Sequence, residues 1–449
     1  MRPIQSTMLN DIDSALSEVS VVCENAPPGS GKSAVARCLQ RQTVPTDIIT
    51  SDNNLIRQTY LKDYPMLNAV MGKDNYKTEE EYEAAQKLAR AVPSIFNPLS
   101  YHYTRTRGLR EPDLIVIDEA HLFVDMLMYL SAYVFPVAKT QIPENAKNEG
   151  DLIKWVYKRY DLLKAAISKI DTPGIVFQEF AKIARLRDTL AEGSQHQVFE
   201  ISKAMIPVAG RRPQKCVVLT PLRVPAGLIK SVTNARKVVA MSGTMSKFDS
   251  ELVAAGRSLA YHQRQCLTPK ANRPVYFDPV PQETRKDPQT LANKIRNIYL
   301  ANQVPTLVHV TYQQQTLLDE LLQDLRPITN TSQNKAKVKE KFISQGGLWL
   351  AAGCAEGLDL PYGQCEQIII PNVMFPDMGD AFVQKRMGLT DGRYWYNLRG
   401  VQNTIQRLFR GLRAADDRCV GHILDPSWSR IYPEFSHEFA ELNMIWGKQ

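Results

Sequence analysis

The sequence predicts an α/β protein with parallel sheets, and three observations carry this prediction. Short apolar runs alternate with helical patterns near the N-terminus, and the same alternation returns from Thr306 onward. A glycine-rich turn joins the first apolar run to the first helical pattern, as happens at the carboxyl edge of many parallel sheets. The 449 residues are enough for two or three domains with buried cores.

The composition is that of an ordinary globular protein. The 55 basic and 47 acidic residues give a formal charge of +8, which fits a polyanionic partner but is also common without one. The seven cysteines include no Cys-x-x-Cys pair and predict reduced thiols in an intracellular, cytoplasmic protein. The N-terminus shows no apolar signal core. The apolar tract His121–Ala138 is broken by Asp125 and predicts a buried helix rather than a membrane span.

The stretch Val21–Ser33 reads as a strand, a glycine-rich turn and the start of a helix, which predicts a phosphate-binding loop. Gly29 and Gly31 let backbone N–H groups turn toward a polyphosphate without an intervening Cβ. Lys32 would reach the β- and γ-phosphates, and the Ser33 hydroxyl would ligate Mg²⁺. The alternative is an ordinary turn between a strand and a helix. The candidate nucleotide-binding residues of this loop are Pro28, Gly29, Ser30, Gly31, Lys32 and Ser33.

A second strand at Asp47–Thr50 and a helix at Asn54–Tyr60 continue the parallel pattern. Further along, Leu114–Asp118 predicts a central strand that ends in two carboxylates. Asp118 would hold Mg²⁺, and Glu119 would orient or deprotonate an attacking water. The alternative is that these carboxylates only cap the following helix.

The run Tyr101–Arg110 interleaves aromatic residues with arginines. This composition suits stacking on bases and pairing with phosphates, and it makes Tyr101 and Arg105 candidates for nucleic-acid contacts. An exposed basic loop without a ligand explains the run equally well.

From Phe123 to about Gly210 the pattern becomes helical, with helices predicted at Asp151–Ile170 and Val176–Glu192 and no catalytic motif. We interpret this region as a helical insertion into the first lobe. Strands at Cys216–Thr220 and Lys237–Thr244 are predicted to complete that lobe. The predicted domains are 1–122 and 211–265 for the first lobe, 123–210 for the insertion and 266–449 for the second lobe.

The second lobe repeats the alternation, with a strand at Thr306–Val310 and a helix at Gln314–Leu325, but it has no phosphate loop of its own. Toward its end, Gln406, Arg410 and Arg413 share one face of a predicted helix. Arginines opposite a phosphate loop suggest arginine fingers that stabilise charge on a γ-phosphate. The alternative is a basic surface helix, weakened by a glycine between the two arginines.

Taken in order, these motifs resemble those of the superfamily-two helicases, and within them the XPD/DinG group, over nearly the whole chain. The group commonly has Glu-Ala-Pro-x-Gly-x-Gly-Lys, which accounts for Ala26, and it has Gly where this chain has Phe409. The matching segments are Arg2–Gln5 with Gln5 as the adenine reader, Ala26–Ser33 (motif I), Thr50–Gln58 (Ia), Asp118–His121 (II, in its DEAH form), Ser242–Thr244 (III), Val310–Tyr312 (IV), Glu356–Asp359 (V), and Gln406, Arg410 and Arg413 (VI).

The resemblance implies two RecA-like lobes, an arch-like insertion in the first of them, and ATP with Mg²⁺ bound between the lobes. Ser33 and Asp118 would hold the metal, and Glu356, Gly357 and Asp359 would lie near the nucleotide. It also implies a monomer that moves 5′→3′ along single-stranded or forked DNA. With the aromatic and basic run included, the candidate nucleic-acid contacts are Thr50, Gln58, Tyr101, Arg105 and Tyr312.

The group usually carries four cysteines between motifs Ia and II, which bind a [4Fe–4S] cluster. Here no cysteine occurs between Cys38 and Cys216. Because the cluster needs thiolate ligands, the sequence predicts a member without it.

Three functions stay open at this point. The first is an ATP-dependent DNA helicase that works alone or beside replication and repair proteins, away from membranes. The second is a translocase that moves on single strands or displaces bound proteins without efficient unwinding. The third is a nucleotide-dependent, nucleic-acid-binding switch, against which the complete motifs II and VI argue, since a switch needs no full hydrolytic set.

Overall fold

The computed structural model places both expected sheets. It describes residues 2–27, 29–40, 44–51, 53–106, 111–130, 132–143, 149–167, 175–192, 199–208, 211–224, 229–230, 232–233, 235–284, 287–354, 358, 360 and 362–447. The chain divides into two compact units, of which the first comprises Met1–Phe123, Thr233–Pro376 and Tyr396–Gln449, and the second Val124–Val232 and Asp377–Trp395. The first unit contains two parallel sheets, which define lobe 1 and lobe 2, so the predicted α/β class is confirmed.

Lobe 1 is built on a sheet of seven described strands in the order β10-β1-β9-β5-β2-β4-β3, with every neighbouring pair parallel. Strands β1, β2 and β5 are buried at every position, because a parallel sheet is covered on both faces. The order places the carboxyl ends of β1, β9 and β5 side by side at one edge. The strands are β1 (Val21–Asn25), β2 (Thr46–Thr50), β3 (Ala69–Val70), β4 (Ile95–Phe96), β5 (Leu114–Asp118), β9 (Lys237–Ser242) and β10 (Leu259–Gln263).

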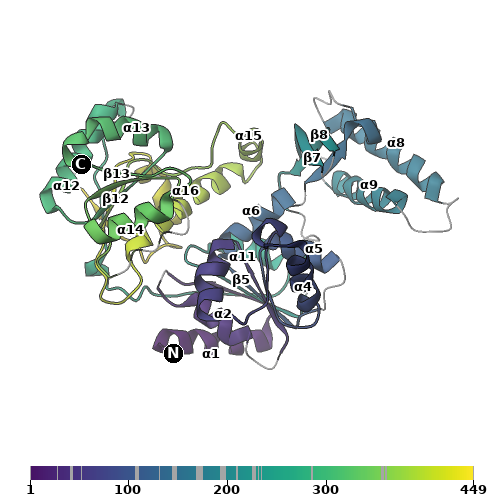
Figure 1. The fold of residues 1–449 in the computed structure, drawn as a ribbon, viewed down its shortest axis with the longest axis horizontal. Coiled ribbons are helices and arrows are strands. Elements are labelled where there is room, and N and C mark those ends of the chain that lie inside the picture. Colours follow the sequence, from purple (N-terminus) through teal and green to yellow (C-terminus); the bar gives the residue numbers. More distant parts are fainter. Residues whose placement is uncertain are drawn as a thin grey trace. The chain divides into compact units, whose positions relative to one another are not determined.

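Helices pack beside the lobe 1 sheet, as Figure 1 shows for α2, α4 and α5. Local signals start several of them: the Thr78 side chain caps α4, and Ser246 and Asp249 form a capping box at α11. The helix predicted at Asn54–Tyr60 differs, because α3 passes into a π-helix at Ile56–Leu61. The helical elements are α1 (Pro3–Glu18), α2 (Lys32–Gln40), α3 (Asn53–Leu55), η1 (Ile56–Leu61), η2 (Lys73–Asn75), α4 (Glu79–Ala89), α5 (Pro98–Thr106), α6 (Ala120–Leu130) and α11 (Lys247–Ala254).

Lobe 2 has a second all-parallel sheet of seven described strands, in the order β13-β14-β12-β15-β16-β11-β17. Its strands are β11 (Pro274–Phe277), β12 (Thr306–Val310), β13 (Ile328–Thr329), β14 (Leu348–Ala352), β15 (Gln367–Ile370), β16 (Val420–Ile423) and β17 (Asn443–Trp446). Its helical elements are η3 (Lys270–Asn272), η4 (Gln282–Thr284), α12 (Pro288–Asn302), α13 (Tyr312–Leu321), η5 (Gln323–Leu325), α14 (Lys335–Gln345), α16 (Gly392–Leu408), η6 (Phe409–Gly411) and α17 (Trp428–Phe435).

The second compact unit holds the insertion, and it differs from the purely helical one that the sequence predicts. It contains a three-stranded antiparallel sheet, β6-β8-β7, packed with two long helices that lie side by side in Figure 1. The strand predicted at Cys216–Thr220 therefore belongs to this sheet and not to lobe 1. The physical reason is that β8 pairs with β7 in a long antiparallel ladder between segments close in sequence, which satisfies the backbone of β8 within the insertion. The elements are β6 (Tyr133–Pro136), α7 (Val137–Thr140), α8 (Glu149–Ile167), α9 (Ile175–Glu192), β7 (Phe199–Val208), β8 (Arg211–Pro221) and α15 (Ala381–Met387).

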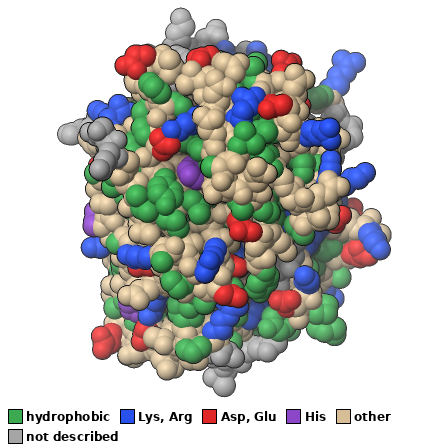
Figure 2. All heavy atoms as spheres, turned by 90° about the vertical axis from the view of Figure 1, so that its left-hand side faces the viewer, with side chains coloured by type: hydrophobic (Ala, Val, Ile, Leu, Met, Phe, Trp, Pro, Cys, Tyr) green, Lys and Arg blue, Asp and Glu red, His purple; other side chains and the backbone are tan. Residues whose placement is uncertain are grey.

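The apolar tract His121–Ala138 divides between α6, β6 and the first residues of α7. Within the described ranges, no helix combines the length and the apolar character that crossing a bilayer requires. On the face drawn in Figure 2, basic and acidic side chains alternate and are interspersed with apolar ones. The excess of basic residues is therefore not gathered into a single patch on that face.

Two histidines of lobe 2, the buried His309 and the partly buried His422, have pKa values lowered by their surroundings. His309 lies in β12, is 1% exposed, and has no hydrogen-bond partner for its Nε2 among the described residues. Burial, reinforced by the positive charges of Arg407 and Arg410, lowers the pKa of His309 well below 6.5. Burial likewise lowers the pKa of His422 to about 4.

We expect the free energy of unfolding to fall as the pH drops from about 6.5 toward about 4. In this window the unfolded chain binds protons at both histidines, whereas folded lobe 2 keeps them neutral. Each histidine contributes at most about 1.4 kcal/mol per pH unit. Urea titrations on both sides of the window should show a weaker pH dependence for His309→Phe than for wild type. The exposed His437→Gln variant is the control, and an unchanged pH dependence in His309→Phe would contradict the prediction.

Candidate functional site

The glycine-rich loop after β1 has the backbone that a phosphate-binding loop requires. Gly29 has φ +81° and Gly31 has φ +85°, which are left-handed values that favour glycine. A Cβ at Gly29 would lie 2.5 Å from the backbone carbonyl oxygen of Arg413, and a Cβ at Gly31 would collide with the side-chain amide of Gln5. The loop is therefore approached closely by α1 on one side and by lobe 2 on the other, and neither glycine tolerates a side chain.

Lys32 begins α2 directly after the loop, and its ammonium group is turned toward that loop. Its Nζ donates a hydrogen bond of 2.8 Å to the carbonyl oxygen of Ala26, and the residue is 9% exposed. Burial lowers the pKa of Lys32; the negative charges of Glu119 and Asp118 oppose this effect, and the positive charge of Arg413 adds to it. The structure thus brings the loop lysine, both predicted carboxylates and one predicted arginine into electrostatic contact.

Asp118 ends β5 as the sequence predicts, and it is 2% exposed. Its Oδ2 accepts hydrogen bonds from Ser33 Oγ at 3.2 Å and from the Tyr60 hydroxyl at 2.8 Å, and its Oδ1 accepts one from the Glu119 backbone N–H at 3.1 Å. Burial and the neighbouring charge of Glu119 raise the pKa of Asp118 to about 6, against the opposing effect of Lys32. The carboxylate is therefore held by three donors at the sheet edge.

Glu119 has a backbone conformation that is rare outside glycine, with φ +54°. Its Oε2 is buried, has no hydrogen-bond partner among the described residues, and lies 3.5 Å from His121 Nδ1. Such strain and such an unsatisfied acceptor persist where the surrounding fold imposes them, and they recur at active sites. The helix-capping alternative does not account for this arrangement, because a cap needs neither feature.

His121 links motif II to two other predicted motifs. Its Nδ1 is 2.7 Å from Ser242 Oγ, and its Nε2 is 2.6 Å from Gln406 Nε2. Because an amide nitrogen only donates, His121 Nε2 accepts from Gln406, and Nδ1 donates to Ser242. Gln406 also reaches Thr244 Oγ1 at 3.3 Å. A continuous chain of hydrogen bonds therefore joins lobe 1 to α16 of lobe 2.

The structure corrects the prediction that Gln406, Arg410 and Arg413 share one helical face. Helix α16 ends at Leu408, a 3₁₀ turn follows, and the chain is extended at Leu412. The turn is tight because Gly411 lies against Cys365 and Cys419, where a Cβ would come within 2.6 Å of the Cys365 carbonyl oxygen. Arg410 Nη1 donates to the Leu358 carbonyl oxygen at 3.1 Å, and the Arg413 backbone is held by Asp417. Arg410 and Arg413 therefore lie on a turn and an extended segment, and the described contacts place Arg413, but not Arg410, beside the glycine-rich loop and Lys32.

A second group of residues joins the lobes and was not predicted as part of the site. Arg399 Nη1 lies 2.7 Å from Asp249 Oδ1, and both side chains are buried. Gln402 Nε2 donates to Asp249 Oδ2 at 2.5 Å and to the Thr244 carbonyl oxygen at 2.7 Å. The capping box around Asp249 is readable in the sequence, but its partners on α16 are not, because they come from the other lobe.

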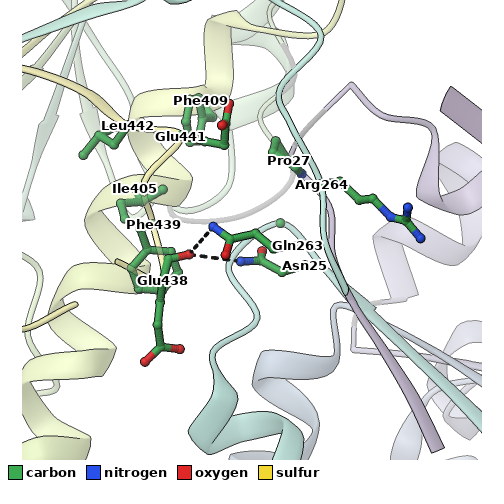
Figure 3. A pocket seen from close by; sticks show the side chains of 11 residues that line it. Asn25, Pro27, Gln263, Arg264, Ile405, Phe409, Glu438, Phe439, Glu441 and Leu442 are labelled. Atoms are coloured by element: carbon green, nitrogen blue, oxygen red, sulfur yellow. Dashed lines mark hydrogen bonds between the residues drawn. The ribbon is translucent and has the colours of Figure 1, made fainter. Parts of the chain in front are cut away.

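A small pocket, partly open to solvent, lies between the lobes beside the loop (Figure 3). Asn25 and Gln263 of lobe 1 both donate to the backbone carbonyl oxygen of Glu438 in lobe 2, at 3.4 and 3.0 Å. In Figure 3 the guanidinium group of Arg264 points away from the pocket. It is bound instead to the buried carboxylate of Glu24. The pocket therefore marks the interface between the lobes and gathers none of the predicted catalytic side chains.

Two of the five predicted contacts with nucleic acid are not supported by the placement of their side chains. Tyr101 is fully buried and packs edge-on against Phe96 at 5.1 Å between ring centroids, so its ring is not available to a base. Thr50 is also fully buried, at the end of β2 beside Asp118. Tyr312, by contrast, is 44% exposed at the start of α13. Helix α5 (Pro98–Thr106) includes the first part of the predicted basic run, residues 101–106.

Other predicted positions fall outside what the structure describes. Pro28, Glu356, Gly357 and Asp359 lie outside the described residues, as do the side chains of Gln58 and Arg105. Gln5 lies inside them: it is 8% exposed on α1, and its Oε1 accepts a hydrogen bond from the Arg2 backbone at 2.7 Å.

The described residues fit a nucleotide with Mg²⁺. The loop offers the ammonium group of Lys32 and the buried hydroxyl of Ser30, for which the described part of the chain provides no hydrogen-bond partner. Ser33 Oγ and Asp118 Oδ2 form a pair of hard oxygen donors 3.2 Å apart, the ligand type that Mg²⁺ prefers. Glycines at positions 29 and 31 leave the backbone open for close approach. No separate group of side chains with metal-binding spacing was found among the described ranges.

Comparison with known proteins assigns the fold. Residues 300–441 match the family described as the helicase C-terminal domain. Among solved structures, XPD in its apo form superposes with a TM-score of 0.60 at 14% identity, covering 98% of this chain and 100% of that one. An XPD helicase gives 0.60 at 13% identity, and Xpd4 of S. tokodaii gives 0.59 at 16% identity, each over 100% of both chains. No curated protein matches the chain.

The protein therefore has the fold of the XPD helicases, with two RecA-like lobes and an insertion in the first of them. The resemblance indicated by the motifs is therefore confirmed at the level of the fold. The family match, residues 300–441, begins near the end of α12 and includes motif VI.

Proposed function

We propose that this protein is an ATP-driven helicase that moves along single-stranded DNA in the 5′→3′ direction. The observation that carries the proposal is the convergence of Lys32, Ser33, Asp118 and Glu119 at one sheet edge, with His121 bound to Gln406 of the other lobe. A site shared by two lobes can couple hydrolysis to their relative movement.

Each residue has a role that its chemistry supports. Lys32 and the loop N–H groups would bind the β- and γ-phosphates, and Ser33 and Asp118 would hold Mg²⁺, which would supply charge neutralisation there. Glu119 has an unsatisfied buried oxygen and accepts the proton of the attacking water. Gln406, Arg410 and Arg413 approach from lobe 2 and stabilise the charge that develops on the γ-phosphate. Gln5, beside Gly31, contacts the adenine base.

The substrate and direction in this proposal rest on the resemblance to the XPD/DinG group. Exposed Tyr312 is the described candidate for a nucleic-acid contact on lobe 2. We propose further that the protein acts as a monomer and carries no iron–sulfur cluster, because the cysteines that would bind one are absent from the sequence between Cys38 and Cys216.

Strand displacement with ATP tests the proposal. Matched duplexes bear a 5′ tail, a 3′ tail or no tail, and single-strand-stimulated ATPase is followed in parallel. We expect stimulated hydrolysis and displacement of the 5′-tailed duplex only. Stimulated hydrolysis without displacement would identify a translocase. If no single strand stimulates the ATPase activity, the proposed motor function would be contradicted, and a nucleotide-dependent switch would be the remaining function.

A further inference from the structure

The hydroxyl group of Tyr60 is placed against the carboxylate that we assign to the metal. Its oxygen donates a hydrogen bond of 2.8 Å to Asp118 Oδ2, the same oxygen that Ser33 reaches at 3.2 Å. When the Ser33 hydroxyl turns to a metal ion, its hydrogen bond to Asp118 is given up. Of the two side chains that bond to Asp118 Oδ2, Tyr60 then remains to hold this oxygen in place.

The backbone around Tyr60 explains how its ring reaches this position. Tyr60 lies within the π-helix Ile56–Leu61, a wider turn that alters the direction of its side chains from that of an α-helix and recurs at functional sites. Ile56 is 0% exposed and Tyr60 is 1% exposed, and both belong to the lobe 1 core together with Val116 of β5. The ring is therefore fixed by apolar contacts on the sheet, and only its hydroxyl oxygen reaches the polar edge.

The burial of this hydroxyl argues for a purpose beyond packing. A phenylalanine would fill the same apolar space without a polar atom that must be satisfied. The hydroxyl instead bonds to a buried carboxylate, and hydrogen bonds to an ionised acceptor are shorter and stronger than neutral ones. The unusual helix and the choice of tyrosine both serve to place one donor on Asp118.

We propose that Tyr60 is a positioning residue that holds Asp118 in the orientation in which it binds Mg²⁺. This inference rests on the proposed function. In this role Tyr60 acts through Asp118, the side chain to which its hydroxyl group is bonded. Its loss should weaken the metal contact while leaving the loop and Lys32, which bind the phosphates, as they are.

The variant Tyr60→Phe removes the hydroxyl and keeps the ring. Binding of a fluorescent ATP analogue is measured in EDTA and over a Mg²⁺ titration. We expect wild-type affinity in EDTA and about a tenfold higher Mg²⁺ concentration at the midpoint, the size expected for one hydrogen bond to a carboxylate. The Mg²⁺ concentration for half-maximal ATPase should rise by the same factor, with kcat at saturating Mg²⁺ within about twofold of wild type.

Tyr76→Phe is the matched control, because the Tyr76 hydroxyl donates to the Ala69 carbonyl oxygen at 2.6 Å in the same lobe and does not touch Asp118. An unchanged Mg²⁺ midpoint in Tyr60→Phe would overturn the inference. An equal loss of analogue affinity with and without Mg²⁺ would also overturn it, since that result indicates a purely structural role. The ATPase and Mg²⁺-dependent binding of the wild type are measured first, so a failure of the proposed function is recognised separately.

Discussion

Lys32→Ala is expected to reduce ATP hydrolysis by at least about a hundredfold. The ammonium group of Lys32 is the buried cation at the start of α2, and burial makes its interaction with phosphate charge stronger than it would be in water. Its hydrogen bond to Ala26 is to a backbone carbonyl, which a phosphate oxygen can replace at little cost. The measurement is steady-state ATPase with saturating single-stranded DNA.

Glu119→Gln should have an effect of similar size for a different reason. The substitution keeps the shape of the side chain and removes its capacity to accept a proton, so hydrolysis should fall while nucleotide binding is retained. Lys62→Ala and Glu18→Gln are controls on exposed helical positions of the same lobe. Near wild-type ATPase in Lys32→Ala or Glu119→Gln would show that the site is assigned wrongly.

Arg399→Met is expected to destabilise the protein by about 3–5 kcal/mol. Arg399 is 4% exposed and Asp249 is 0% exposed, so removing the arginine leaves a carboxylate buried without its charge partner. Gln402 and Ser246 still donate to Asp249, but neutral donors do not replace the lost charge. Urea denaturation at neutral pH measures the change in the free energy of unfolding.

The double variant Arg399→Met with Asp249→Asn separates the pair from its surroundings. It should recover a large part of the lost stability, because no unpaired charge then remains buried. Arg296→Met is the matched control, since Arg296 pairs with Asp324 on the surface of lobe 2 and its removal should leave stability nearly unchanged. A similar small change in Arg399→Met and Arg296→Met would refute the role of the buried pair.

Much of the fold could be predicted because its signals are local. Parallel strands buried on both faces appear as apolar runs, and β1, β5 and β12 lie where those runs occur in the sequence. The residues at strand ends were predictable for the same reason: Asp118 closes an apolar run, and the carboxyl ends of parallel strands meet at one edge. The order of the motifs along the chain also indicated which segments form lobe 1 and which form lobe 2.

Other features depend on competition between segments far apart in the chain. Strand β8 has the pattern of a lobe strand, but its pairing with β7 decides its sheet. The π-helix at Ile56–Leu61 reads as an ordinary helix, since no local signal distinguishes the two. Tyr101 lies in a basic, aromatic run that suits nucleic acid, yet packing against Phe96 buries it.

The sequence by itself determined the α/β class, the phosphate-binding loop and the carboxylates of motif II, because each follows from residues that are neighbours in the chain. Only the tertiary structure decided that Tyr60 reaches Asp118, that His121 bonds to Gln406, and that Arg399 pairs with Asp249. These contacts join residues from 58 to 285 positions apart. Their partners are selected by burial and by the need to satisfy polar groups, which depend on the folded chain as a whole.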